Sequence, residues 1–368
     1  MNILIACDSF KDALDAPSVC RAIGRGLQLS NTKIKTQIFP LADGGEGLSD
    51  ILNFHLGLKK IEMEVHDPLF RKIKATYNLS KDNTTAFIEM AQAAGLQLLT
   101  HEERNPLKTT TFGVGEMIND ALEKGAKRIV LGIGGSATND LGIGMAAAMG
   151  WSFLDKNKEE LSPIGGNLDK ISSITPPQYK SYSDVLFEVM CDVTNPLLGK
   201  TGAAHVYSKQ KGATDAMIDI LEKGAENCTK VGSFSKIEIE TAGAGAAGGL
   251  GFGALVFLNA TIKSGIDAMM VLTDFDKQVA WADVIFTGEG RLDSQTAHGK
   301  LIAGIISRAQ DKPVIALCGA LEMTPQYVKD LGLKAAFSIA QKACSLPEAL
   351  AGTAENLEKT AFNVGRLL

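Results

Sequence analysis

The sequence predicts an α/β protein built from two domains, one of which is interrupted by the other. The first observation is length, because 368 residues exceed what one hydrophobic core usually supports. The second is the pattern of hydrophobic residues. Both ends of the chain alternate short apolar strands with amphipathic helices, whereas the middle contains strands of alternating apolar and polar residues. We therefore expect a discontinuous, flavodoxin-like doubly wound domain and an inserted domain with a mixed sheet.

The N-terminal region is predicted to form a β-α-β-α unit. Apolar runs at residues 2–7 and 33–39 indicate buried strands, and Pro17 opens a helix, since proline is favoured in a first helical turn. A second helix is expected over residues 48–55. Polar segments follow both strands, Asp8–Lys11 after the first and Asp43–Gly47 after the second.

The alternation of apolar strands and amphipathic helices returns after residue 280. Strands are expected at residues 284–286, 314–317 and 335–338, with a polar loop at Thr287–Gln295 and helices at 300–309, 326–331 and 347–364. Together with the N-terminal strands this makes five strands, each followed by a helix, which is the count of a flavodoxin-like sheet. We expect the split domain to comprise residues 1–58 plus 275–368 and the inserted domain residues 59–274.

The inserted domain is predicted to begin with an antiparallel meander. Residues 60–66, 71–78 and 86–90 alternate like strands, and turn-forming residues separate them. Further elements expected in this domain are helices at 109–124 and 215–227 and a strand at 185–190.

The most informative stretch of the inserted domain is Arg128–Gly150. Ile129–Leu131 is a buried strand by composition, and Gly132, Gly134 and Gly135 then permit a tight turn and close approach of a ligand. Four good helix-capping residues follow, which predicts a helix start among Ser136, Thr138, Asn139 and Asp140. A strand, a glycine loop and a helix N-terminus together form an anion site, most often for phosphate. The alternative is a plain βα turn with small residues packed closely.

A dinucleotide site is a rival interpretation of the same glycines. Gly132–Ala137 fits the pattern GxGxxG/A after a strand, and Asp155 lies about where a ribose-binding acid would, which would suit an NAD-dependent oxidoreductase. Against it, Asp140 would place a negative charge close to the pyrophosphate. No GxxxxGK[ST] or GxSxG pattern occurs, which excludes a P-loop NTPase and gives no support to a serine hydrolase.

Composition limits the class of protein further. A net charge of −5 does not indicate the positively charged surface that proteins use to bind nucleic acid. The six cysteines form no CxxC pair, so we expect reduced, mostly buried thiols, no cysteine-bound metal and a cytoplasmic location. Thr241–Ile262 carries no charge over 22 residues but contains six glycines, so we expect a buried glycine-rich loop and helix and no membrane span.

The predicted strand ends carry the groups that phosphoryl transfer needs. This chemistry requires glycine backbone donors and a cation for phosphate oxygens, carboxylates for Mg²⁺, and a carboxylate near the accepting hydroxyl. The candidate cations are Lys11, Arg291 and Lys300, and the candidate carboxylates are Asp43, Glu46, Asp192, Glu289 and Asp293. Each acid alone could equally be a capping or turn residue. A cleft between the two domains would bring the set together.

Long motifs spread over nearly the whole chain resemble those of the bacterial glycerate kinase family that includes the glycerate 2-kinases. They are Asp8–Lys11, Pro40–Gly47, Glu89–Ala91 with Gly95-Leu96, Gly132–Asp140, Cys191–Leu197, Gly243–Gly251, and Thr287–Gln295 with Gly299-Lys300. Three residues depart from the family's usual pattern: Cys7 stands in place of proline, and Asp12 and Leu141 stand in place of glycine.

The resemblance implies ATP- and Mg²⁺-dependent phosphorylation of D-glycerate by a flavodoxin-like and a restriction-endonuclease-like domain. It favours 2-phosphoglycerate over 3-phosphoglycerate. The expected partners are the small molecules glycerate and ATP, with no nucleic acid and no membrane, and a homo-oligomer is possible. A non-enzymatic sensor of sugar acids is a further alternative.

On this basis each candidate residue receives an expected role. Asp192 is expected to orient or deprotonate the accepting hydroxyl, with Lys11 and Asp43 also in the catalytic set. Glu289 or Asp293 is expected to position Mg²⁺, and Arg291 or another cation to bind the glycerate carboxylate. The residues expected to bind phosphate or substrate are Ser9, Gly44, Glu46, Gly134, Gly135, Ser136, Asn139, Asp140, Asn195, Gly245, Arg291, Ser294 and Lys300.

Overall fold

The chain divides into two compact units in a computed structural model that describes residues 1–42, 48–178, 182–293 and 300–368. Unit 1 comprises Met1–Asp43 and Ile266–Leu368, and unit 2 comprises Gly44–Gly265. These bounds differ from the expected domain ranges at two short stretches. Helix α2 (Leu48–Leu56) falls in unit 2 because it packs against strands β4 (Lys72–Leu79) and β5 (Thr85–Glu89) of that unit. Most of α10 (Gly265–Leu272) falls in unit 1.

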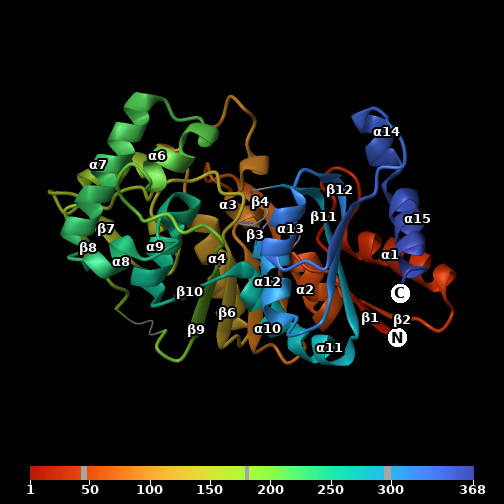
Figure 1. The fold of residues 1–368 in the computed structure, drawn as a ribbon. Helices are drawn as coiled ribbons and strands as arrows, with labels where there is room; N and C mark the ends of the chain where they lie inside the picture. Colours follow the sequence, from red (N-terminus) through yellow and green to blue (C-terminus); the bar gives the residue numbers. More distant parts are fainter. Residues whose placement is uncertain (43–47, 179–181, 294–299) are drawn as a thin grey trace. The chain divides into compact units, whose positions relative to one another are not determined.

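Unit 1 is built on a five-stranded parallel sheet (Figure 1). Its strands are β1 (Asn2–Ile5), β2 (Lys35–Ile38), β11 (Val284–Leu292), β12 (Val314–Leu321) and β13 (Ala335–Ser338). They run in the order β13-β12-β11-β1-β2, and all four neighbouring pairs are parallel. Counted along unit 1 alone, this is the order 2-1-3-4-5.

Helices cover both faces of this sheet. Helices α1 (Ala16–Ser30) and α15 (Thr353–Gly365) lie side by side on one face, over a core that includes Ile3, Ile5 and Phe286. Because side chains alternate along a strand, the buried Leu4 and Ile285 face the other way. On that side Figure 1 shows α12 (Lys300–Arg308). The remaining helices of unit 1 are α11 (Phe275–Trp281), α13 (Pro325–Leu331) and α14 (Leu346–Ala351).

Two expectations about unit 1 were wrong. The predicted loop after Phe286 is mostly strand, because β11 continues to Leu292 and pairs with β12 as far as Leu321. Its glycines and charges obscured the strand in the sequence. The expected closing helix is two helices, α14 and α15, separated at Gly352.

Unit 2 contains a six-stranded mixed sheet. In sequence order its strands are β3 (Lys59–His66), β4 (Lys72–Leu79), β5 (Thr85–Glu89), β6 (Arg128–Gly132), β9 (Leu186–Met190) and β10 (Thr261–Lys263). Strands β3, β4 and β5 form the expected antiparallel meander, and β5, β6, β9 and β10 continue the sheet in parallel. A separate antiparallel pair joins β7 (Ser152–Leu154) to β8 (Ser173–Thr175).

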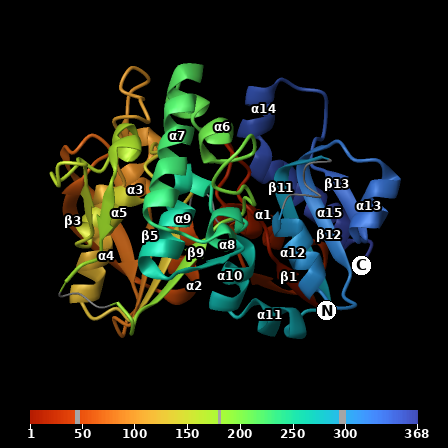
Figure 2. The same ribbon diagram turned by 90° about the vertical axis from the view of Figure 1, so that its left-hand side faces the viewer.

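The helices of unit 2 are mostly short (Figure 2). Besides α2, they are α3 (Ala91–Ala94), α4 (Phe112–Glu123), α5 (Ile143–Ala148), α6 (Ala203–Tyr207), α7 (Asp215–Val231), α8 (Lys236–Glu240), α9 (Ala246–Leu258) and the 3₁₀ turns η1 (Leu96–Leu98), η2 (Gly165–Lys170) and η3 (Lys209–Lys211). Within the described ranges no helix is long and apolar enough to cross a membrane. The uncharged stretch 241–262 instead forms a loop, the kinked helix α9 and strand β10.

Candidate active site

Three segments of unit 2 meet where the neighbouring parallel strands β6 and β9 end. We call residues 133–142, which follow β6, the Gly134 segment, and residues 243–249, before the regular part of α9, the Gly245 segment. The third segment is residues 191–196, which follows β9. The Gly245 amide donates to Asn195 O at 3.0 Å, and the Leu141 amide donates to Gly248 O at 3.1 Å. Parallel strands place their carboxyl ends at one edge, so this clustering follows from the sheet.

The Gly134 segment is a loop and not the beginning of a helix. Helix α5 starts at Ile143, so the expectation of a helix start among Ser136–Asp140 was wrong. The polar residues hold the loop instead, and the chain turns into α5 through Leu141 and Gly142, whose φ angles are +54° and +73°. Any anion site here therefore rests on loop amides. The exposed part of the segment is Gly134 and Gly135.

Asp140 organises the turn from the Gly134 segment into α5. Its buried carboxylate accepts from the amides of Thr111 at 2.8 Å, Gly142 at 3.0 Å and Gly144 at 3.2 Å, and from the Thr111 hydroxyl at 2.8 Å. Burial raises the pKa of Asp140, and these four donors oppose that shift. Asn139 is also buried, and its side-chain amide donates to Ser208 Oγ at 2.6 Å. Both side chains support the segment from within.

The Gly134 and Gly245 segments pack against each other so closely that only glycine fits at the contact. Gly248 has φ +69°, and a Cβ atom built there would lie 2.0 Å from Thr138 O. The Ser136 hydroxyl lies 3.2 Å from Ala247 O, which links the segments a second time. The glycines of this uncharged run therefore serve close backbone packing.

Asp192 and Asn195 occupy the third segment, and both are partly buried. Asp192 Oδ1 accepts from the Gly265 amide at 3.0 Å and from Ser264 Oγ at 3.3 Å, so its carboxylate is tied to the chain that follows β10. The Asn195 side chain donates to Thr201 O at 2.8 Å and accepts from the Tyr207 hydroxyl. Asp192 thus has a fixed orientation at the same sheet edge as the glycine segments.

Lys211, the last residue of η3, was not among the residues predicted from the sequence. Its side chain is 1% exposed, and Nζ donates to Thr138 O at 2.6 Å and to Ser136 Oγ at 3.2 Å. Burial lowers the pKa of Lys211 to about 7, while the charge of Asp140 opposes that shift. In the sequence Lys211 is one of two lysines in a polar stretch, without a pattern that marks burial.

In unit 1 the loop after β1 lies beside the second half of β11. The Asp8 amide donates to Gly288 O at 3.1 Å, and a Cβ on Gly290 would lie 3.6 Å from the Lys11 amide nitrogen. The exposed Ser9 donates from its amide to Asp8 Oδ1 at 2.6 Å. The structure therefore brings Ser9 and the exposed Lys11 close to the charged part of β11.

Arg291, in this part of β11, is already paired within unit 1. Arg291 donates to Glu322 at 2.6 Å, and its Nε lies 3.2 Å from Asp293 Oδ2. Glu289 and Arg291 are two positions apart on the strand and so share a face. Of the other predicted residues, Asp43, Gly44, Glu46 and Ser294 lie outside the described residues, as does the side chain of Lys300 at the start of α12.

No group of three or more potential metal ligands of the types His, Cys, Asp and Glu occurs in the described part of the chain.

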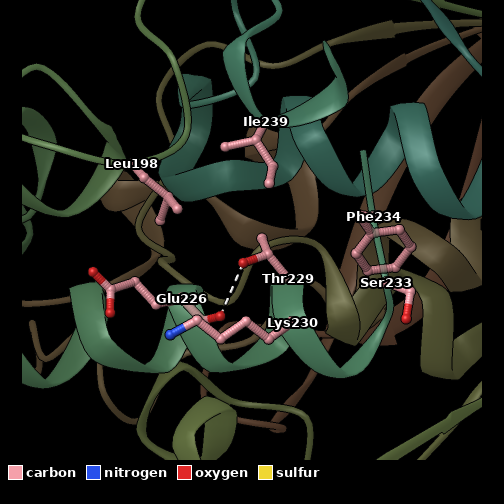
Figure 3. A pocket seen from close by; sticks show the side chains of 7 residues that line it. All are labelled: Leu198, Glu226, Thr229, Lys230, Ser233, Phe234 and Ile239. Atoms are coloured by element: carbon pink, nitrogen blue, oxygen red, sulfur yellow. Dashed lines mark hydrogen bonds between the residues drawn. The ribbon is translucent and has the colours of Figure 1, made fainter. Parts of the chain in front are cut away.

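A pocket of about 500 Å³ in unit 2 is lined by none of the candidate residues (Figure 3). Helix α7 provides Glu226, Thr229 and Lys230 on one side, and Leu198, Ser233, Phe234 and Ile239 complete the lining. The candidate site is therefore the sheet edge and not this pocket.

Fold and site together define an α/β protein whose candidate ligand groups gather at the carboxyl ends of parallel strands. A model of the glycerate kinase family matches residues 3–368. The chain is 42% identical to the glycerate kinase of Bacillus cereus, over 99% of this chain and 97% of that protein. It is 38% identical to the glycerate 2-kinase of Escherichia coli, over 100% of this chain and 98% of that protein. The chain belongs to the glycerate kinase family.

A solved structure agrees with this assignment. The crystal structure of a glycerate kinase 2 from Salmonella typhimurium is similar to this fold with a TM-score of 0.88. The two sequences are 39% identical, and the match covers 100% of this chain and 98% of the other.

Proposed function

We propose that this protein is a glycerate kinase that transfers the γ-phosphoryl group of ATP to D-glycerate, with 2-phosphoglycerate as the favoured product. The observation that carries the proposal is similarity to glycerate kinases along the whole chain, at 42% identity over 99% of its length. The geometry supports it, because two glycine-containing segments and an oriented carboxylate lie at one sheet edge. The location of the active site between two domains stays a prediction.

The fold names implied by the resemblance are part of the same proposal. The strand order 2-1-3-4-5 of unit 1, with all neighbours parallel, is that of flavodoxin-like sheets. We assign this fold to unit 1. The restriction-endonuclease-like assignment of unit 2 rests on the resemblance, together with the mixed sheet in which a meander continues into parallel strands.

In this proposal the phosphates of ATP bind the exposed backbone of Gly134 and Gly135. Gly245 shapes the neighbouring segment, and Lys11 or Lys300 supplies a cation. Backbone amides suit phosphate oxygens because they donate without adding bulk. Ser136, Asn139 and Asp140 then support the loop, which is a more indirect role than the sequence suggested, because all three are buried. Arg291 is the proposed ligand of the glycerate carboxylate, after exchange of its present acidic partners.

The proposed Mg²⁺ ligands are Glu289 or Asp293. Carboxylate oxygens are the correct donor type, and Mg²⁺ typically binds one or two carboxylates while substrate phosphates and water complete its shell. Glu289 on β11 and Asp293 directly after it therefore suit the ion without a larger protein cluster. When bound, the ion would neutralise charge on the phosphates of ATP.

The rival oxidoreductase function is less well supported by the geometry. In a dinucleotide fold the glycine turn leads directly into a helix whose N-terminus faces the pyrophosphate. Here β6 ends at Gly132 and α5 begins at Ile143. In a thermal shift experiment we therefore expect stabilisation by ATP with Mg²⁺ and none by NAD.

The decisive test of the activity is release of ADP in the presence of D-glycerate, measured by a coupled assay. We expect turnover that depends on both substrates, and NMR of the product should give the phosphorylated oxygen. Binding of glycerate without ADP release would support the sensor alternative and refute the kinase.

The assignment of Asp192 is tested by Asp192→Asn. Asparagine keeps an oxygen at Oδ1 for the Gly265 amide but removes the charge, so we expect kcat to fall by about 10²–10⁴ with an unchanged fold. Asp219→Asn, an exposed acid of α7, is the matched control and should leave kcat unaltered. Near-normal turnover of Asp192→Asn would remove Asp192 from the catalytic role.

A further inference from the structure

Lys211 is buried against the Gly134 segment, and no carboxylate of the described residues is hydrogen-bonded to it. Its Nζ contacts a carbonyl, Thr138 O at 2.6 Å, and a hydroxyl, Ser136 Oγ at 3.2 Å. Burying an ammonium group is costly unless it is well paired, so a lysine in this place needs an explanation beyond packing.

The turn that carries Lys211 braces the Gly134 segment at two points. Ser208 accepts a hydrogen bond from Asn139 at 2.6 Å, and Lys211 binds Ser136 and Thr138. The turn itself is fixed, because Gly212 has φ +89° and a Cβ there would lie 2.2 Å from Arg104 O. The residues it holds come directly after the exposed Gly134 and Gly135.

The same contacts connect Lys211 to the second glycine segment. Ser136 Oγ lies 3.2 Å from Nζ of Lys211 and 3.2 Å from Ala247 O. One hydroxyl thus joins the buried ammonium group to both glycine segments. Loss of the ammonium group would release Thr138 O and Ser136 together.

In the described part of the chain, few charged groups act on Lys211. The charge of Asp140, on the Gly134 segment, raises the pKa of Lys211. The Gly245 segment, which packs on the Gly134 segment, has no titratable residue. On its own turn, Lys209 is exposed and pairs with Asp215 at 2.8 Å, and Arg104 packs its backbone against Gly212. Among the described residues, Asp140 is thus the one acid whose charge acts on the ammonium group, and the residues that bind this group follow the exposed Gly134 and Gly135.

We propose that Lys211 is a positioning residue of the phosphate site: its ammonium group, held by Ser136 and Thr138, fixes the backbone of Gly134 and Gly135 and adds positive charge beneath a bound phosphate. This rests on the proposed function, since it names a determinant of ATP binding at the same site. A positioning role predicts that ATP binding weakens when Lys211 loses its proton, near pH 7.

The test compares Lys211→Met with the control Lys209→Met in steady-state kinetics from pH 6 to pH 9. We expect the KM for ATP of the unsubstituted protein to rise as the pH passes the pKa of Lys211. Lys211→Met should raise this KM roughly tenfold at pH 6, the effect of one hydrogen bond from a charged donor, and should lose the pH dependence. Lys209→Met should behave as the unsubstituted protein. A wild-type KM and pH profile in Lys211→Met would overturn the proposal, even with lowered thermal stability.

Ser136→Ala provides a second variant in case Lys211→Met does not fold. It removes one acceptor of the ammonium group, so the KM for ATP should rise and its pH transition should move to lower pH. An unaltered transition would contradict the proposal.

Calorimetry of the binding of ATP with Mg²⁺, over the same pH range, distinguishes failure of the proposed kinase function from failure of the proposed role of Lys211. Intact pH-dependent binding without phosphorylation of glycerate would refute the proposed function and leave the role of Lys211 standing. Phosphorylation that is insensitive to Lys211→Met would refute only the latter.

Discussion

At the scale of single residues, the buried ammonium group of Lys211 links protein stability to pH. Its pKa is about 7 in the folded protein and near the ordinary 10.5 when the chain is unfolded. Between these values the unfolded chain binds more protons, so the free energy of unfolding should rise with pH, by about 1.4 kcal/mol per pH unit. Urea unfolding at pH 7.5, 8.5 and 9.5 measures this slope.

Lys211→Met provides the comparison for this prediction. Methionine cannot bind the proton, so the variant should lack this part of the slope, whereas the exposed Lys209→Met should retain it. Equal slopes in all three proteins would mean that Lys211 is not buried with a lowered pKa.

At two of the positions where this chain departs from the family's usual pattern, the backbone conformation shows why glycine is usual there. Asp12 and Leu141 stand where glycine is usual, and their φ angles are +62° and +54°. This is the left-handed region, which side chains adopt at a cost and glycine does not. The sequence marked these positions, but the conformation that glycine serves there became apparent only in the structure.

At the scale of elements, the packing of α1 on α15 gives a matched pair of substitutions. A Cβ on Gly26 would lie 2.2 Å from Glu358 O of α15, whereas a Cβ on Gly24 would meet Ile5 Cδ1 at an ordinary 3.5 Å. We expect Gly26→Ala to lower the free energy of unfolding by about 1–3 kcal/mol through overpacking. Gly24→Ala should raise it by about 0.5–1 kcal/mol, because alanine favours the helix. Denaturant titration measures both, and equal effects would contradict the close approach of the helices.

The elements also show what the sequence could predict. The spacing of Val19, Ile23 and Leu27 predicted α1 correctly, because residues spaced in this way lie on one face of a helix and here that face is buried. The extent of β11 could not be read in this way, because Glu289 and Arg291 follow a glycine and resemble a loop, although pairing with β12 keeps them in the strand.

The candidate site was predictable only in part, for a related reason. Gly134 and Asp192 follow recognisable buried strands, so their place at the sheet edge could be inferred. The start of α5 could not, because the capping residues are satisfied by tertiary contacts such as Asp140 with Thr111. Lys211 was missed because its burial depends on a turn that no local pattern reveals.

At the scale of the whole molecule, each unit contains at least one hydrophobic cluster whose members, among the described residues, all belong to that unit. The core under α1 and α15 contains residues of unit 1 only, and the clusters around β6 and α9 contain residues of unit 2 only. Each unit also holds one of the two tryptophans, Trp281 on α11 in unit 1 and Trp151 in unit 2, where it packs on Phe257. Single-tryptophan variants can therefore report on each unit by itself.

A hydrophobic cluster within each unit predicts that the units respond differently to a local defect. Trp151→Phe leaves the fluorescence of unit 1, and Trp281→Phe leaves that of unit 2. Adding Gly26→Ala to each should lower the denaturant midpoint reported by Trp281 clearly more than the midpoint reported by Trp151, because the clash lies between two helices of unit 1. Gly24→Ala in the same backgrounds controls for the substitution itself. Equal shifts of both midpoints would show that the units unfold as one cooperative block, although each contains a hydrophobic cluster of its own.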